Sequence, residues 1–412
     1  MNDFQNKLEQ YAQVTLEIGL GFRAGQRLMI RADVNAAPTV RAMVRAAYQR
    51  GARFVEVLWE DEYALLARHE LAPRDSFETI SAWAATSLNA VAERGDALLM
   101  VVSDNPRLFE QQDAALVQLE KNTMRQAMIP VYQKAMTHQI TWCVVAASSE
   151  GWAHNIFPTL EPAQANEKLW AAIFQASGMN HQHPLEYWQA EVQRLKVRRE
   201  VFNANQYSSL RFTGPGTKLE VGLVDGHIWS GGQTSTPDGV LFAANIPTYE
   251  IFTMPHRERT NGIVCGTKPT VISGSLVEGW TLEFKDGLVI KASAERGESV
   301  LHALLETDEG AKRLGEVALV PGDSPVGQTG ILFQNTLFDE NAACHIALGR
   351  AYPTTITNGA ELEPEEMIAK GVNTSLEHHD VMVGSNEVDV DGIFANGSVE
   401  PLMRAGQFVF ES

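Results

Sequence analysis

Hydrophobic and polar positions follow two alternating patterns in the first half of the chain. Apolar runs of strand length recur, and residues 37–49, between the first two runs, place apolar side chains at helical spacing. Strands that alternate with helices in this way are typical of an open, mostly parallel α/β sheet. The expected strands are QRLMIRAD (26–33), RFVEVLWED (53–61), DALLMVVSD (96–104) and ITWCVVAAS (140–148).

The pattern changes after a long helical stretch at 161–200. From about 208, short alternating strands recur between glycines, with Asp286-Gly287 and Asp391-Gly392 among the expected turns. Helices are expected at Ser299–Arg313 and from about 340 to 350. We therefore expect an α/β domain over residues 1–200, followed by a β-rich α+β domain over residues 201–412.

Composition and charge narrow the classes of function. The chain has 412 residues, which favours about two or three domains. With 33 basic and 51 acidic residues, its net charge is −18. Such a surface repels phosphate backbones and anionic lipid, so we expect neither nucleic acid nor a membrane as a partner.

The three cysteines and the N-terminal segment bear on location. Cys143, Cys265 and Cys344 lie far apart, without the spacing of a zinc knuckle. The first twenty residues lack the basic head and apolar run of a signal peptide, and no apolar run is long enough to cross a bilayer. We expect a soluble cytoplasmic protein without disulfides.

Several common catalytic motifs are absent from the sequence. It contains no GxGxxG or GxxxxGK[ST] after a predicted strand, no GxSxG and no HExxH. A nucleotide site and a covalent serine mechanism therefore have no support.

The segment EHHDVMVG (377–384) offers a first pair of candidate ligands. His378 and Asp380 are two residues apart in a predicted strand, so their side chains point to the same face. One imidazole and one carboxylate projecting together can hold a divalent metal. His379 points the other way and is interpreted as an ordinary core or surface histidine.

A second segment, DENAACHIALGRAY (339–352), combines Asp339, Glu340, His345 and Tyr352. His345 and Tyr352 are seven residues apart, nearly two helical turns, and share a face if the expected helix continues as far as Tyr352. Asp339 would stabilise the helix N-terminus whatever its other role. By itself the segment is equally compatible with a capped helix that carries a satisfied histidine.

Two further carboxylates lie in apolar surroundings. Glu250 lies in NIPTYEIFTMP and Glu316 in LGEVALVPG. A glutamate in an apolar strand is costly unless it is paired or metal-bound, although an edge strand facing water is the simpler explanation for each alone. Together with Glu340, His345, His378 and Asp380, they form a carboxylate-rich set that suits two divalent ions about 3.5–4 Å apart. Zinc, cobalt, manganese or magnesium could be accommodated.

Four segments together resemble the M29 family of metallo-aminopeptidases, also called the thermophilic aminopeptidase or aminopeptidase T/S family. The resemblance covers most of residues 240–392 in order and is weaker in the first half of the chain. Its segments are NIPTYEIFTMPHRERTNGIV, LGEVALVP, SPVGQTGILFQNTLFDENAACHIALGRAYP and HHDVMVGSNEVDVDG.

The resemblance implies a ligand set and an architecture. It implies that two divalent ions are held by Glu250, Glu316, His345, His378 and Asp380. Glu340 matches a position that is either a ligand or a general base, and Tyr352 matches a tyrosine at the edge of the metal centre. Family members are cytoplasmic dimers whose active sites face an enclosed chamber. The residue before the first glutamate is often acidic in the family but is Tyr249 here, which bears on substrate preference.

The reaction implied by the resemblance is release of N-terminal amino acids from peptides. A water activated between two metal ions attacks the first peptide bond, Glu316 or Glu340 carries the proton to the departing amine, and Tyr352 donates a hydrogen bond to the oxyanion. Two other functions remain open: a metal-dependent amidase that acts on small non-peptide amides, and a non-catalytic binding protein that retains the fold.

Overall fold

A computed structural model describes residues 3–272 and 274–411 and divides the chain into two compact units. Unit 1 comprises Met1–Ala190 and Gln233–Pro247, and unit 2 comprises Glu191–Gly232 and Thr248–Ser412. Among the described residues, no helix is both long and apolar enough to cross a membrane.

Unit 1 is built on a four-stranded parallel sheet with the strand order β2-β1-β3-β4. All four strands expected from the sequence are present, which confirms the mostly parallel α/β character of the first half. One of the two central strands, Ala97–Val102, is apolar along its length, as is typical of a parallel sheet covered by helices. The strands are β1 (Arg27–Asp33), β2 (Phe54–Glu60), β3 (Ala97–Val102) and β4 (Trp142–Ala146).

Several helices of this unit begin at a side-chain cap. The Asp61 carboxylate accepts hydrogen bonds from the backbone N–H groups of Tyr63 and Ala64 at the start of α3, and Asp113 caps α5 in the same manner. The helices are α1 (Asp3–Val14), α2 (Ala37–Gln49), α3 (Glu62–Leu71), α4 (Ala82–Arg94), α5 (Ala114–Ala127), α6 (Ile129–Met136), α7 (Glu150–Ile156) and α8 (Pro162–Ala176). A short hairpin of β7 (Gln233–Ser235) and β8 (Leu241–Ala243) completes the unit, and α9 (Pro184–Asn205) follows α8.

Unit 2 is rich in antiparallel strands, as expected for the second half. Its larger sheet has eight strands in the order β14-β13-β10-β6-β5-β18-β19-β20. These strands are β5 (Ser209–Gly214), β6 (Thr217–Leu223), β10 (Pro255–Cys265), β13 (Thr281–Lys285), β14 (Leu288–Ser293), β18 (Asp389–Ile393), β19 (Val399–Arg404) and β20 (Gln407–Phe408). Asp286-Gly287 forms the expected turn between β13 and β14. The prediction of a turn at Asp391-Gly392 is wrong, because both residues lie within β18.

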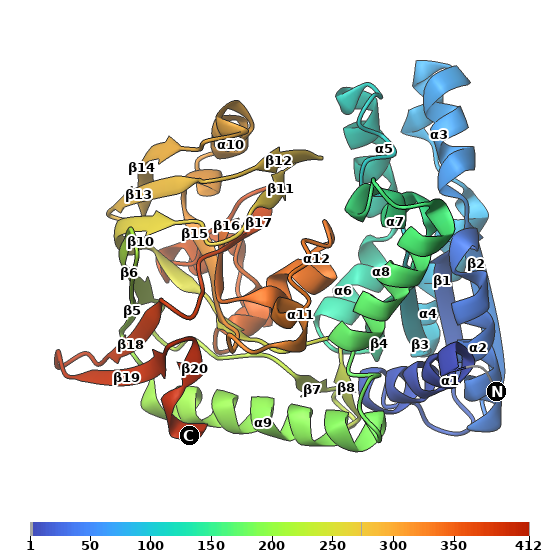
Figure 1. Ribbon diagram of the computed structural model, residues 1–412, viewed down its shortest axis with the longest axis horizontal. Helices are drawn as coiled ribbons and strands as arrows, with labels where there is room; N and C mark the ends of the chain where they lie inside the picture. Colours follow the sequence, from blue (N-terminus) through green and yellow to red (C-terminus); the bar gives the residue numbers. More distant parts are fainter. Residues whose placement is uncertain (1–2, 273, 412) are drawn as a thin grey trace. The chain divides into compact units, whose positions relative to one another are not determined.

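The smaller antiparallel sheet of unit 2 has the order β17-β16-β15-β9. Figure 1 labels its strands β15, β16 and β17. One of its faces packs into an apolar core shared with the eight-stranded sheet, to which Val317, Ile346 and Val381 contribute. Its strands are β9 (Ile251–Thr253), β15 (Leu314–Leu319), β16 (His345–Gly349) and β17 (His378–Met382), and a separate pair is formed by β11 (Thr270–Ile272) and β12 (Ser275–Val277).

The helices expected in the second half differ from those observed. The helix expected over Ser299–Arg313 is the shorter α10 (Glu298–Leu305), followed by a 3-10 turn. The helix expected from about 340 to 350 is absent. Instead, α11 (Pro325–Gln328), α12 (Thr336–Asp339) and a 3-10 turn at Glu340–Ala342 lead into strand β16, and α13 (Pro364–Ala369) follows later. A short apolar run fits either periodicity, and pairing with β15 and β17 makes it a strand.

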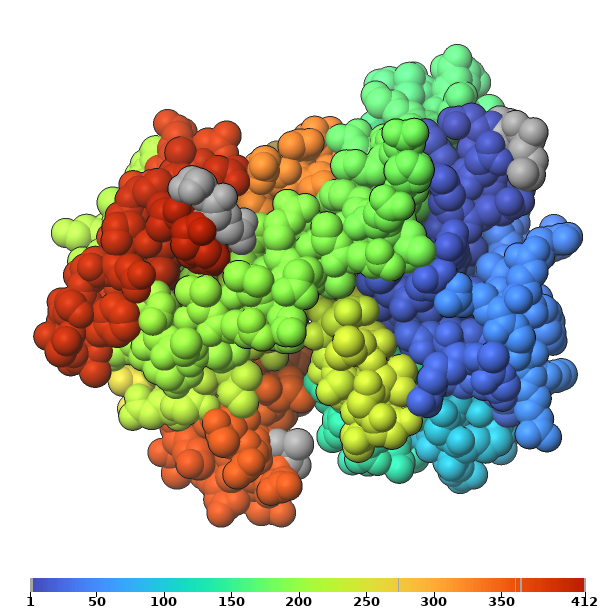
Figure 2. All heavy atoms as spheres, turned by 90° about the horizontal axis from the view of Figure 1, so that it is seen from below, coloured from blue at the N-terminus to red at the C-terminus, as the bar shows by residue number. Residues whose placement is uncertain are grey.

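The C-terminal segment packs on α9 within unit 2. The Arg198 guanidinium lies 4.6 Å from the centroid of the Phe408 ring, and the centroids of Phe202 and Phe408 are 6.1 Å apart. Figure 2 shows the red C-terminal residues against the light-green helix. These contacts fix the end of the larger sheet to the helix that begins the unit.

Candidate metal centre

Candidate ligands project from one face of the four-stranded sheet because of its register. Glu316 on β15 is opposite Ala347 on β16, and Ala347 is in turn opposite Asp380 on β17. His345 and His378 lie two residues from Ala347 and Asp380 respectively, so strand alternation places them on the same face. The neighbouring positions on these strands point into the core described above. Side chains from three strands therefore form one polar face of the sheet.

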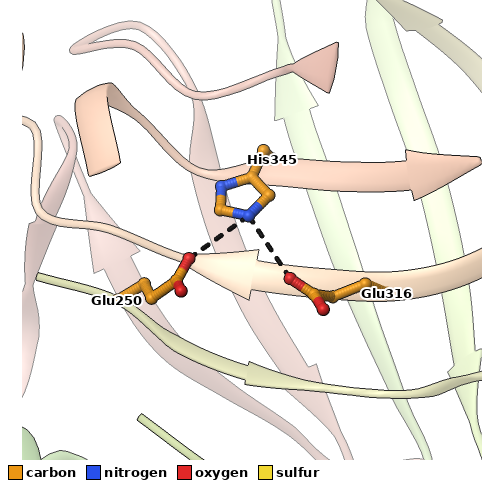
Figure 3. Close-up of side chains that lie close together, drawn as sticks. All are labelled: Glu250, Glu316 and His345. Atoms are coloured by element: carbon orange, nitrogen blue, oxygen red, sulfur yellow. Dashed lines mark ion pairs between the residues drawn. The ribbon is translucent and has the colours of Figure 1, made fainter. Parts of the chain in front are cut away.

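Glu250 joins this face from the residue immediately before β9, which pairs with β15. His345 Nε2 lies 3.3 Å from Glu250 Oε2 and 3.4 Å from Glu316 Oε1. Dashed lines in Figure 3 mark these two pairs. All three side chains are buried: His345 is 0% exposed, Glu250 7% and Glu316 5%. The interpretation of either glutamate as a water-facing residue of an edge strand is therefore excluded.

A second group lies beside the first and shares Glu316 with it. His378 Nε2 lies 3.6 Å from Asp380 Oδ1 and 3.9 Å from Glu316 Oε2. Within each group the ligand atoms lie within 4.8 Å of one another. The first group is Glu250, Glu316 and His345, and the second is Glu316, His378 and Asp380. His345 Nε2 and Asp380 Oδ1 are 4.0 Å apart, which places the two groups side by side.

Backbone carbonyls orient both imidazoles. His345 Nδ1 lies 3.2 Å from the carbonyl oxygen of Ala343, and His378 Nδ1 lies 2.7 Å from that of Arg350. A carbonyl oxygen can only accept, so Nδ1 carries the proton in each ring and donates it to that carbonyl. Nε2 is then the ring atom that faces the carboxylates, and it is the atom that each imidazole could offer to a metal ion.

The donor set fits a divalent cation. Glu250 Oε2 and Asp380 Oδ1 are buried and have no hydrogen-bond partner within residues 3–272 and 274–411. Buried polar atoms are normally satisfied, and several lone pairs that converge without protons repel one another. A bound cation removes both costs, and a mixture of carboxylate oxygens with imidazole nitrogens suits zinc, cobalt or manganese.

The electrostatics of the cluster reflect this crowding of carboxylates. Burial by itself would lower the pKa of His345, but its hydrogen bond to Glu316 and the charges of Glu250 and Asp380 raise that pKa to about 9. Burial raises the pKa of Glu250, the nearby His345 opposes this, and the charges of Glu316 and Asp380 add to it. Without a cation, protons take the place of the missing positive charge.

Glu340 lies close to the cluster but belongs to neither ligand group. It occupies the 3-10 turn at Glu340–Ala342 that precedes β16. Burial raises the pKa of its carboxyl well above the ordinary value, and the charges of Glu250, Asp380 and Glu316 raise it further.

Tyr352 also lies at the edge of the cluster, although the helix expected to carry it is absent. Its ring centroid is 4.7 Å from that of His378 and 6.2 Å from that of Phe252. Burial raises the pKa of the Tyr352 hydroxyl, and the charges of Glu316 and Asp380 raise it further. The phenol therefore keeps its proton at neutral pH and can donate it in a hydrogen bond.

Two neighbouring residues have structural roles. His379 points to the other face of β17, as expected, and its Nε2 lies 3.1 Å from Thr270 Oγ1. Asp339 does not begin a helix as expected but ends α12, and its carboxylate accepts hydrogen bonds from the N–H groups of Phe333 and Asn335. Asp339 therefore holds the loop that leads to Glu340.

Sequence reasoning gave no role to Ala347, which lies at the centre of the candidate ligands. A larger side chain between Glu316 and Asp380 would fill the space that their carboxylates border. An isolated alanine in an apolar strand gives no signal by itself, because its importance depends on its partners in the register.

Comparisons with known proteins agree along the whole chain. A family model described as thermophilic metalloprotease (M29) matches residues 4–408. Aminopeptidase 2 from Geobacillus stearothermophilus is 41% identical over 411 residues, which cover 100% of both chains. Aminopeptidase T from Thermus thermophilus is 39% identical over 409 residues, which cover 99% of this chain and 100% of that relative. The solved structure of wild-type AmpT from Thermus thermophilus matches with a TM-score of 0.93 at 39% identity, covering 98% of this chain and 100% of that one.

Proposed function

Because the chain belongs to the thermophilic metalloprotease family M29, it is a metal-dependent peptidase, and we propose that it releases N-terminal amino acids from peptides. Relatives of matching length that are named aminopeptidases support this activity. The observation that carries the proposal is the pair of buried ligand groups that share Glu316. An ordinary ion-pair network has no reason to leave two buried carboxylate oxygens of such a cluster without a hydrogen-bond partner.

In this proposal the two groups would hold two divalent ions per chain. One ion would be held by Glu250, Glu316 and His345, and the other by Glu316, His378 and Asp380. Zinc, cobalt, manganese and magnesium remain candidates because oxygen and nitrogen ligands discriminate poorly among them. When bound, such ions supply Lewis acidity at the scissile carbonyl and lower the pKa of a water molecule to about 7.

Glu340 is the group that we assign to proton transfer. Its carboxyl lies close enough to the ligands to be affected by their charges, yet it is outside both ligand groups. A carboxyl with a raised pKa can accept a proton from the attacking water and deliver it to the departing amine. Glu316 is less suited to this task, because both of its oxygens face imidazoles.

Tyr352 is assigned to the oxyanion. Its neutral phenol beside His378 can donate a hydrogen bond to the negative oxygen that develops at the carbonyl carbon. A donor held by ring contacts with Phe252 and His378 need not reorganise during the reaction.

A panel of aminoacyl-p-nitroanilides and their N-acetylated forms tests the activity. Each substrate is assayed after EDTA treatment and after addition of Zn²⁺, Co²⁺, Mn²⁺ or Mg²⁺. We expect metal-restored cleavage of the free-amine substrates only. Cleavage of small non-peptide amides instead would indicate an amidase, and metal binding without any cleavage would indicate a non-catalytic binding protein.

We further propose a cytoplasmic homodimer. The three free cysteines, two of them buried, support a reducing compartment. The dimer rests on the family resemblance, and light scattering of the purified protein tests it directly.

A further inference from the structure

Asn341, which follows Glu340, is a fully buried residue whose side-chain amide forms hydrogen bonds through both its oxygen and its nitrogen. Its Oδ1 accepts a hydrogen bond of 2.6 Å from the backbone N–H of Tyr249, and its Nδ2 donates one of 3.1 Å to the carbonyl oxygen of Leu337. Asn341 is 0% exposed, so neither bond is exchanged with solvent.

This amide connects two stretches of chain that carry different parts of the proposed active site. Tyr249 immediately precedes Glu250, which belongs to the first ligand group, and Asn341 immediately follows Glu340. The two bonded residues are 92 positions apart in the sequence. The hydrogen bond is therefore a direct link between the backbone that carries Glu250 and the backbone that carries Glu340.

The turn that contains Glu340 is also held at two other points. Ser324 Oγ donates a hydrogen bond of 2.7 Å to the carbonyl oxygen of Asn341, and it accepts one from the N–H of Gly327 at the start of α11. Asp339 binds the N–H groups of Phe333 and Asn335, as described above. Among these contacts, the Asn341 amide is the one that reaches toward Glu250.

The chemistry of the contact explains the residue type. One partner is an N–H donor and the other a carbonyl acceptor, and an amide side chain satisfies both at once. A carboxylate would only accept and would face the Leu337 carbonyl with negative charge. An alanine would leave the buried N–H of Tyr249 and the carbonyl of Leu337 without their partner.

We propose that Asn341 is a positioning residue that sets the distance between the carboxyls of Glu250 and Glu340. Through Glu250 it supports the first metal-binding group, and through Glu340 it supports proton transfer. This inference rests on the proposed function. Residues that orient metal ligands typically change metal affinity or activity by about 10–100-fold when they are replaced.

The matched control for its test is Asn203 on α9. Asn203 also clamps a backbone through both ends of its amide, since its Oδ1 accepts from the N–H of Trp229 and its Nδ2 donates to the carbonyl oxygen of the same residue. It belongs to the same unit but contributes to neither ligand group. Asn203→Ala therefore removes the same kind of bond without affecting the proposed site.

The experiment compares Asn341→Ala, Asn341→Ser and Asn203→Ala with the unaltered protein. Zinc affinity is measured by competition with a chromophoric chelator, kcat and KM are measured on leucine p-nitroanilide, and thermal unfolding is followed after EDTA treatment. For Asn341→Ala we expect zinc affinity and kcat to fall by about 10–100-fold, with little change in KM. Asn203→Ala should lower the unfolding temperature but leave zinc affinity and kcat unchanged.

Two outcomes separate failure of this inference from failure of the proposed function. If the unaltered protein is active but Asn341→Ala matches Asn203→Ala in every measurement, the residue is only structural and the inference is overturned. If the unaltered protein neither binds zinc nor cleaves the substrate, the proposed function itself fails. Should Asn341→Ala not fold, Asn341→Ser, which retains a hydroxyl, supplies the comparison.

Discussion

Glu316 and His345 approach within 3.4 Å across neighbouring strands, although neither is directly opposite the other. In the register of β15 and β16, Glu316 faces Ala347 and His345 faces Ala318. The two ligand candidates therefore meet on a diagonal, and the small alanine side chains leave room between them. Much of the proposed site depends on this arrangement.

Enlarging Ala347 should close the space between the ligand groups. We expect Ala347→Leu to abolish high-affinity zinc binding and to reduce kcat by at least about 100-fold, because its side chain would lie between Glu316 and Asp380. Equilibrium dialysis with zinc and the p-nitroanilide assay measure both effects. Ala347→Ser, which adds a single oxygen, serves as the control. Unchanged zinc affinity in Ala347→Leu would contradict the spatial argument.

Substitutions of the two adjacent histidines of β17 should have very different effects on zinc binding and activity. His378 points toward Glu316 and Asp380, whereas His379 contacts Thr270 on the other face. We expect His378→Ala to lose one zinc ion per chain and at least about 100-fold in activity, since ligands matter at least as much as the groups that orient them. His379→Ala should retain both ions and most of the activity. Equal effects of the two substitutions would argue against the assigned face.

Glu340→Gln should separate proton transfer from metal binding. The amide retains the size and polarity of the side chain but cannot carry the proton. We expect kcat to fall by about 10²–10⁴-fold while two zinc ions are still bound, because general acid–base groups contribute on that scale. Metal analysis and steady-state kinetics on one preparation suffice. Loss of an ion would instead identify Glu340 as a ligand.

The stability of the metal-free protein should fall as the pH rises. The pKa of His345 is raised from 6.5 to about 9 in the folded state, so its stabilising effect is complete below about pH 6.5 and is lost as the pH rises through about 9. The raised pKa values of Glu250 and Glu340 act in the same direction, because their ionisation in the folded state is unfavourable.

Zinc should reverse this trend, because its ligands must be deprotonated and its affinity rises with pH. Thermal unfolding at pH 6.5 and pH 9, with EDTA and with zinc, measures the effect. We expect zinc to raise the unfolding temperature more at pH 9 than at pH 6.5. A stability of the EDTA-treated protein that does not change between these pH values would contradict the electrostatic description of the cluster.

The sequence by itself determined many of the local elements, above all the strands of unit 1. Apolar runs identified the four parallel strands of unit 1, and alternation in β17 assigned His378 and Asp380 to one face before any pairing was known. Residue types also suggested the chemistry, since carboxylates and imidazoles are what divalent ions bind. These inferences succeed because strand periodicity and ligand preference are properties of a few neighbouring residues.

The tertiary structure decided which of these faces meet. Residues 345–349 fit a helix as well as a strand, and only pairing with β15 and β17 makes them the centre of the sheet. The shared position of Glu316, the space beside Ala347 and the link from Asn341 to Tyr249 all join residues far apart in the chain. Periodicity states which way a side chain points but not what it faces, because register and strand order are set by packing across the whole unit.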